Sequence, residues 1–206
     1  MIHFRLLLVT DRHSCRESLG DVLARLAAAL PPGALAVELR EKDLSGLALY
    51  ELALDLKRVL DPQGVPILVN DRLDVAMAAG CAGVHLPESG LDPADVRAVF
   101  PGLIGRSTHS VETAAALDPA CVDYATFGPV FDTPSKRAYG PPQGVGRLRE
   151  AVAASRVPLF AIGGIGPGTA PELVGTGFRG IAAISAILGS ADPVGAALGL
   201  SDRCPK

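Results

Sequence analysis

The chain has 206 residues, a formal net charge of −3, 49% hydrophobic residues and only 4% aromatic residues. Its length suits one domain, and we expect a single domain over residues 1–206. The weakly acidic balance excludes a global basic field that would recruit nucleic acid, so we expect no nucleic-acid partner. Any anion site must be a local cluster of positive groups.

The cysteines and the N-terminal segment point to a reducing compartment. The four cysteines are far apart and show no metal or redox spacing, which predicts reduced, mostly buried thiols. The apolar run over residues 4–9 lacks a basic leader and is too short to cross a membrane. We therefore expect a cytoplasmic protein without a membrane partner.

Short apolar runs alternate with longer Ala/Leu-rich stretches along the whole chain. Strict alternation predicts a parallel sheet covered by helices, and eight units favour closure into an α/β (β/α)8 TIM barrel over an open doubly wound sheet. We predict strands at Arg5–Thr10, Leu35–Arg40, Pro66–Asn70, Gly83–Leu86, Leu103–Ser107, Tyr124–Gly128, Pro158–Ile162 and Gly180–Ser185. We predict helices at Ser18–Leu30, Ser45–Leu60, Leu73–Ala79, Pro93–Phe100, Val111–Leu117, Gly146–Ala154, Thr169–Gly175 and Pro193–Leu200.

Polar residues follow most of these strands at the end where α/β barrels carry their active sites. Seven strand ends with such residues are more than chance placement predicts. One connection, residues 129–144, is long for a compact barrel, which favours a functional flap. The polar residues are Thr10, Asp11, Asn70, Asp71, His85, Ser107, His109, Thr133, Ser135, Lys136, Gly163, Gly164 and Ser185.

The second predicted strand carries alternating charges. Because side chains alternate faces along a strand, Glu38, Arg40 and, if the strand extends, Lys42 share the face that points into the barrel. Buried charges are costly unless they are paired or bind something charged. We favour an anion site built on Arg40 and Lys42; an internal ion pair between Glu38 and Arg40 is the alternative.

Two further segments offer donors to phosphate. The loop at residues 132–136 combines the hydroxyls of Thr133 and Ser135 with the Lys136 ammonium, although it also reads as an ordinary solvated turn. Glycines at 163 and 164 permit close backbone approach, and the helix after the eighth strand, preceded by Ser185, offers N–H groups. Together they predict two anionic groups, one near each segment.

Asp71 and two histidines leave alternatives open. Asp71 suits a magnesium ion that bridges pyrophosphate, and it equally suits the N-cap of the third helix. His85 and His109 suit acid–base chemistry or satisfied positions inside the barrel.

At these residues the chain resembles the thiamine-phosphate synthase and thiazole tautomerase superfamily, nearly end to end. The motifs that carry the resemblance are Val37-Glu-Leu-Arg-Glu-Lys42, Val69-Asn-Asp-Arg72, Gly83-Val-His-Leu86, Gly105-Arg-Ser-Thr-His-Ser110, Gly128-Pro-Val-Phe-Asp-Thr-Pro-Ser-Lys136, Ala161-Ile-Gly-Gly-Ile165 and Ala183-Ile-Ser-Ala-Ile187.

The resemblance implies a Mg²⁺-assisted, dissociative coupling of hydroxymethylpyrimidine pyrophosphate with thiazole phosphate. It implies that Asp71 is a magnesium ligand and that Glu38 contacts the pyrimidine. It leaves a homo-oligomer open. By the same resemblance, the pyrophosphate is held by Arg40, Lys42, Asn70, Ser107, Thr133, Ser135 and Lys136, with Arg40, Lys42 and Lys136 as the catalytic cations, and the thiazole phosphate by Gly164, Ile184 and Ser185.

Three departures from the synthase pattern keep other functions open. Glu38 stands where the synthases usually have Gln, and Gly90 stands where they have a second magnesium-binding Asp, for which Glu88 is a candidate substitute. Residues 86–87 and 105–110 look more like the tautomerase branch, yet the tautomerase's catalytic His aligns with Pro129. The alternatives are an isomerase with His85, His109 or Glu38 as its base, and a non-catalytic phosphate-ligand regulator.

Overall fold

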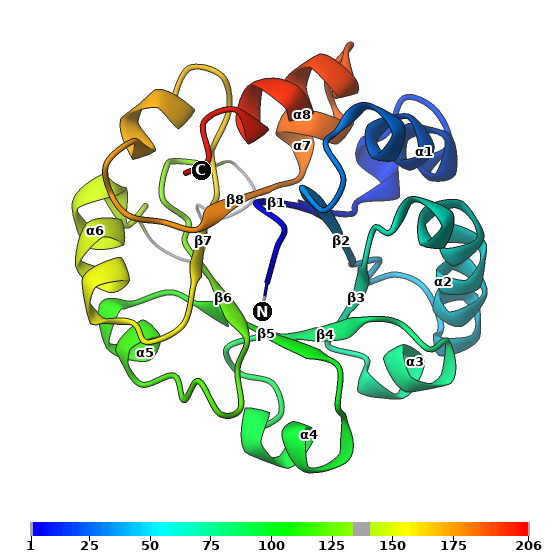
Figure 1. Cartoon of the computed structure of the whole chain (residues 1–206), viewed down its shortest axis with the longest axis horizontal. Helices are drawn as coiled ribbons and strands as arrows, with labels where there is room; N and C mark the ends of the chain where they lie inside the picture. Colours follow the sequence, from blue (N-terminus) through cyan, green and yellow to red (C-terminus); the bar gives the residue numbers. More distant parts are fainter. Residues whose placement is uncertain (1, 134–140, 206) are drawn as a thin grey trace.

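The computed structural model describes residues 2–133 and 141–205. Eight parallel strands close into a barrel in the order of the sequence, and helices surround it (Figure 1). This confirms the predicted TIM barrel. The strands are β1 (Leu6–Val9), β2 (Leu35–Leu39), β3 (Ile67–Asn70), β4 (Gly83–Leu86), β5 (Leu103–Thr108), β6 (Tyr124–Phe127), β7 (Leu159–Ile162) and β8 (Gly180–Ala183).

Helices follow the strands on the outside of the barrel, and most begin at a side-chain cap. Ser18, Ser45, Asp92, Ser110 and Asp192 each accept a hydrogen bond from the first turn of a helix. The helices are α1 (Leu19–Ala29), α2 (Gly46–Leu60), α3 (Leu73–Ala78), α4 (Pro93–Val99), α5 (Val111–Ala115), α6 (Gly144–Ala154), α7 (Ser185–Leu188) and α8 (Pro193–Ser201), with 3₁₀ turns η1 (Arg12–Ser14), η2 (Asp61–Gln63) and η4 (Ala170–Leu173).

Two predicted elements are wrong in detail. The segment Thr169–Gly175 forms only the short turn η4, because the backbone leaves the helical region at Val174 and Gly175 has a left-handed φ of 80°. The eighth strand ends at Ala183, and Ser185 already belongs to the short helix α7, which we did not predict. Periodicity cannot separate a strand from one helical turn in so short an apolar run.

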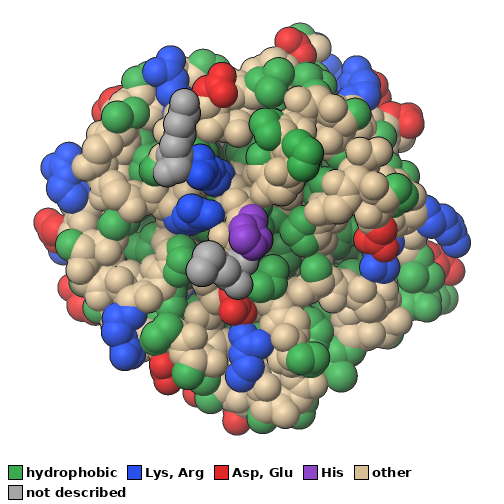
Figure 2. Space-filling view, viewed as in Figure 1, with side chains coloured by type: hydrophobic (Ala, Val, Ile, Leu, Met, Phe, Trp, Pro, Cys, Tyr) green, Lys and Arg blue, Asp and Glu red, His purple; other side chains and the backbone are tan. Residues whose placement is uncertain are grey.

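Alternate strand residues fill two separate layers. One set packs against the helices, and the other fills the barrel interior with Leu7, Leu68, Tyr124 and Phe160, all of which are inaccessible to solvent. Phe4, which precedes β1, joins the interior set. The N-terminus therefore closes one end of the barrel, the end that faces the viewer in Figure 1. Figure 2 shows the same face, with hydrophobic side chains beside a group of basic ones.

The state of the cysteines and the length of the helices can be compared with the sequence predictions. All four cysteines are free; Cys81 and Cys204 are buried, whereas Cys15 and Cys121 are half-buried. Among the described helices, none has the length and apolar character needed to span a membrane.

We expect Phe160→Ala to lower the free energy of unfolding by about 3–5 kcal/mol, because it removes a fully buried ring and leaves a cavity. Its ring centroid lies 5.2 Å from that of Phe4 and 5.5 Å from that of Tyr124, so two further rings lose packing. Urea denaturation measures the change. Leu47→Ala, at a position 67% exposed on α2, is the matched control and should shift stability by less than about 0.5 kcal/mol. Equal effects of the two substitutions would contradict this account of the core.

Candidate functional site

The carboxyl ends of the strands gather the predicted polar residues at the end of the barrel opposite the N-terminus. Asn70 ends β3 and pairs in register with His85, while Ser107 lies near the end of β5. Thr133 is half-buried in the loop after β6. Ser135 and Lys136 lie outside the described residues, as does much of the predicted flap.

The three charged residues in and after β2 differ in how deeply they are buried. Glu38 is 3% exposed inside the barrel, Arg40 is half-buried just past the strand end, and Lys42 is exposed beyond it. The alternative ion pair between Glu38 and Arg40 does not form. Within residues 2–133 and 141–205, no carboxylate pairs with the side chain of Arg40 or Lys42. Two cations at the barrel rim are therefore available to an anion.

A hydrogen-bonded chain of Tyr124, His85 and Ser107 lies beside Glu38 in the barrel interior. The Glu38 carboxylate oxygen Oε2 lies 3.8 Å from His85 Nδ1. That nitrogen is also 2.9 Å from the Tyr124 hydroxyl, and His85 Nε2 is 3.0 Å from Ser107 Oγ. His85 is thus a satisfied interior histidine. If the Tyr124 hydroxyl donates to Nδ1, Nε2–H donates to Ser107 and leaves the serine proton for an anionic ligand.

Burial shifts the pKa of Glu38 and of His85 toward the neutral form of each side chain. It raises the pKa of Glu38 to about 7, against a smaller opposing effect of Arg40. It lowers the pKa of His85 to about 3, and the charges of Arg106 and Arg40 act in the same direction. Burial, with a further contribution from Glu38, also raises the pKa of Tyr124 well above its usual value. The barrel interior therefore presents neutral donors and acceptors beneath a cationic rim.

Asp71 has the backbone and the free carboxylate of a ligand-binding residue. Its φ of 61° is positive, which is uncommon outside glycine, and its N–H donates to the His85 carbonyl over 2.9 Å. It does not cap α3, whose N-cap is Arg72 without a side-chain hydrogen bond. Arg72 instead pairs with Asp74 at 2.5 Å. The described residues donate no hydrogen bond to the exposed Asp71 carboxylate, which remains available to a cation.

Gly90 lies beside Asp71. A Cβ atom at residue 90 would come within 3.4 Å of Asp71 Oδ1, so a carboxylate there would adjoin the first one. Glu88 does not replace it, since its two oxygens accept from His109 N at 3.0 Å and approach His109 Nδ1 at 2.7 Å. In the described part of the chain, no three His, Cys, Asp or Glu side chains cluster as metal ligands. The residues fit a cation held by one protein carboxylate, with its other ligands from an anion and water.

The ends of β7 and β8 present a second group of candidate donors to an anion. Gly163 and Gly164 have φ values of 97° and 65°, and a Cβ at Gly164 would lie only 2.6 Å from the Asp132 carbonyl oxygen. Glycine is therefore required there. The N–H groups of Gly164, Ser185 and Ala186 find no acceptor in the described structure. These three donors suit phosphate oxygens.

Glu41 and Arg12 were missed as site residues. Glu41 is 5% exposed although it stands between Arg40 and Lys42, and it accepts hydrogen bonds from the backbone and side chain of Arg12. The one signal in the sequence was the position of Arg12 shortly after the end of the first predicted strand.

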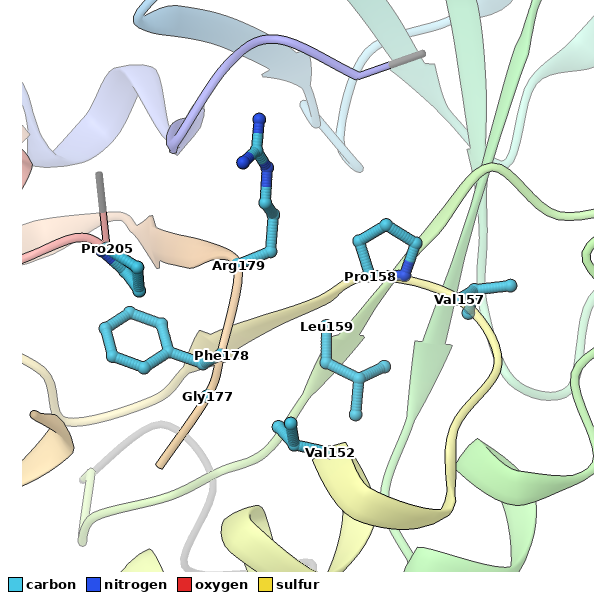
Figure 3. Close-up of a pocket in the computed structure, with 8 residues that line it drawn as sticks. All are labelled: Val152, Val157, Pro158, Leu159, Gly177, Phe178, Arg179 and Pro205. Carbon is cyan, nitrogen blue, oxygen red and sulfur yellow. The ribbon is translucent and has the colours of Figure 1, made fainter. Parts of the chain in front are cut away.

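A cavity of about 340 Å³ lies at the other end of the barrel (Figure 3). It is lined by residues at the starts of β7 and β8, including Leu159 and Phe178. Arg179 points away from these apolar side chains and donates to the carbonyls of Ile2 and His3. No polar groups converge there, so this cavity is not the candidate site.

The pKa shifts of Glu38 and His85 have opposite effects on how the free energy of unfolding changes with pH. We therefore predict that substituting either residue alone changes this pH dependence. Glu38 contributes stability below its unfolded pKa that is lost as pH rises toward 7; His85 contributes stability above its unfolded pKa that is lost as pH falls toward 3. Between about pH 5 and 6.5 the two effects oppose each other. Relative to the unsubstituted protein, Glu38→Gln should gain about 1.4 kcal/mol of unfolding free energy per pH unit, and His85→Gln should lose a similar amount.

Urea denaturation at several pH values, followed by circular dichroism, measures these differences. Background titration cancels because each variant is compared with the unsubstituted protein at the same pH. Two flat differences would show that neither group changes its pKa on folding.

The comparisons with known proteins agree with this geometry. Residues 6–187 match the family model described as thiamine monophosphate synthase (TMP-TENI). The chain is 44% identical to a putative thiamine-phosphate synthase of Geobacter sulfurreducens, covering 93% of this chain and 90% of that protein. It is 42% identical to the thiamine-phosphate synthase of Albidiferax ferrireducens, with coverage of 95% and 90%.

A solved structure of a similarly named enzyme has the same fold. The thiamine phosphate pyrophosphorylase from Pyrococcus furiosus superposes with a TM-score of 0.86 at 28% identity, over 98% of this chain and 96% of that one. The relatives at 42–44% identity match over nearly the whole chain, as does the family model. The chain therefore belongs to the thiamine monophosphate synthase family.

Proposed function

We propose that the protein is a transferase that joins hydroxymethylpyrimidine pyrophosphate to thiazole phosphate, forming thiamine phosphate and pyrophosphate. The observation that carries the proposal is the pair of anion-binding features at one end of the barrel. Among the described residues, the cations that follow β2 have no carboxylate partner, and the backbone N–H groups that follow β7 and β8 have no acceptor. A reaction between two phosphorylated small molecules needs two such features. The names of the relatives point to the same reaction.

In this proposal each substrate has its own set of residues. Glu38 contacts the pyrimidine from the barrel interior, and Asp71 would hold Mg²⁺. The assignments of Ser135 and Lys136 rest on sequence resemblance alone. The pyrophosphate set is Arg40, Lys42, Asn70, Ser107, Thr133, Ser135 and Lys136, and the thiazole phosphate set is Gly164, Ile184 and Ser185.

A protonated Glu38 can do the work of the amide that the synthases usually carry there. The neutral carboxyl has one donor and one acceptor in a plane, as an amide does. Both match the ring nitrogen and the exocyclic amine of an aminopyrimidine. The raised pKa of Glu38, about 7, favours this neutral form.

The chemistry needs charge stabilisation and water exclusion. The bond between the pyrimidine methylene carbon and the pyrophosphate oxygen breaks, and its electron pair leaves with pyrophosphate. The lone pair of the thiazole nitrogen then forms the new C–N bond. Arg40 and Lys42 stabilise the leaving charge, and the closed barrel keeps water from the methylene cation. Mg²⁺, when bound by Asp71 and the pyrophosphate, would supply further neutralising charge.

The two alternative functions have less support. An isomerase needs a base that reaches its substrate, but both nitrogens of His85 are occupied and its pKa is lowered to about 3. His109 is paired with Glu88, and Pro129 cannot transfer protons. Nothing in the site favours a regulator without turnover.

We expect Arg40→Ala and Lys136→Ala each to lower kcat/KM for coupling by about 100-fold or more, because each removes a cation that stabilises departing pyrophosphate. The assay mixes both substrates with Mg²⁺ and measures thiamine phosphate, with an EDTA control. Arg58→Ala is the matched surface control, since Arg58 pairs only with Asp55 on the exposed side of α2. Thermal unfolding verifies the fold. Unchanged turnover in both site variants would reject the proposed function.

We expect Gly90→Asp to lower the Mg²⁺ concentration needed for half-maximal coupling by about tenfold, because it places a second carboxylate beside Asp71. Gly90→Ala is the matched control. Its Cβ meets Pro87 Cδ at 3.0 Å and Pro87 O at 3.1 Å in the same way but brings no charge. Titration of Mn²⁺ binding by both variants gives a readout independent of turnover. Equal metal affinities for Gly90→Asp and Gly90→Ala would show that residue 90 does not reach the cation.

A further inference from the structure

The segment that carries Arg40 and Lys42 lies past the end of β2, where no ladder of strand hydrogen bonds holds it. The β1–α1 connection holds it instead. Thr10 N donates to the Glu38 carbonyl over 2.8 Å, and Arg40 N donates to Thr10 Oγ1 over 2.9 Å. Thr10 is fully buried. The position of the cationic segment therefore depends on the residues that follow β1.

Arg12 makes the second connection between these loops. The Glu41 carboxylate accepts from Arg12 N at 3.1 and 3.2 Å and from Arg12 Nη1 at 3.0 Å. The Arg12 guanidinium also binds Asp43 through both terminal nitrogens. It thus lies between two carboxylates that flank Lys42 in the sequence. Glu41, which is 5% exposed, depends on Arg12 for most of its hydrogen bonds.

This arrangement keeps the negative charge of Glu41 apart from the positive charges of Arg40 and Lys42. Glu41 is adjacent in the chain to Arg40 and Lys42, and a nearly buried carboxylate without a partner pairs with the nearest cation. The Arg12 guanidinium opposes that pairing, because it neutralises the Glu41 carboxylate through Oε2 while the Arg12 backbone N–H binds both carboxylate oxygens. The cations of the rim then keep their charge for an external anion.

We propose that Arg12 is a positioning residue of the pyrophosphate site, which holds the Glu41 carboxylate away from Arg40 and Lys42. This inference rests on the proposed function. Arg12 itself does not touch the substrate; it acts through Glu41.

The experiment measures the affinity of the full chain for inorganic pyrophosphate by calorimetry. Arg12→Ala should raise the Kd about tenfold, because Glu41 loses the guanidinium that neutralises its charge and its carboxylate then competes with pyrophosphate for the cations. The double variant Arg12→Ala/Glu41→Gln should return to within about threefold of the starting Kd, since an amide does not compete as an anion. A purely structural role of Arg12 would give no such rescue. Arg25→Ala, which breaks an exposed pair with Glu17, is the matched control.

The outcomes distinguish this inference from the proposed function. An unchanged Kd in Arg12→Ala, or a double variant as weak as Arg12→Ala, would overturn the role of Arg12. If Arg12→Ala does not fold, Arg12→Lys replaces it. Its Kd should be higher than that of the starting protein by less than tenfold. Arg40→Ala tests the site itself: absence of binding by the starting protein, or no loss in Arg40→Ala, would overturn both proposals.

Discussion

The cost of burying charge in a closed barrel organises this molecule. Parallel strands point every second side chain into an interior from which water is excluded, so each inward residue must be apolar or fully hydrogen-bonded. The chain fills the N-terminal half of the interior with Leu7, Leu68, Tyr124 and Phe160. Above them, His85 joins Tyr124 to Ser107, and Glu38 adjoins His85 at 3.8 Å. The cations Arg40 and Lys42 lie above them at the rim.

In the proposed function, the barrel interior and the charged rim bind different parts of the substrate. A neutral, hydrogen-bonding floor suits an uncharged heterocycle, whereas cations at the rim suit pyrophosphate. Low dielectric around the reacting bond strengthens the action of rim charges on a developing anion. The same low dielectric penalises any carboxylate left unpaired near the rim, which is why the partners of Glu41 matter as much as the cations themselves.

The sequence predicted the barrel well because its signal is repeated eight times. Each strand was found to within one or two residues, and alternation along strand two correctly turned Glu38 inward. Family membership, predicted from seven motifs, is confirmed. The predictions failed where one short segment carried the only signal. The turn η4 was predicted as a longer helix, and Ser185, the first residue of α7, was predicted as the end of a strand. Contacts between loops, such as Arg12 with Glu41, depend on chain positions 29 residues apart and have no local signature.

Position 90 shows how electrostatic terms can offset each other. Replacing a second carboxylate with glycine removes one cation ligand, and it also removes one negative charge beside the place proposed for pyrophosphate. Asp71 is then the one free carboxylate at that rim within the described residues, since Glu88 is paired with His109 and Glu41 with Arg12. In the proposed site, the anion would be held more by fixed cations and less by metal. In such a site the position of Arg40 and Lys42 controls affinity more strongly, because a fixed cation cannot adjust its place as a hydrated metal ion can.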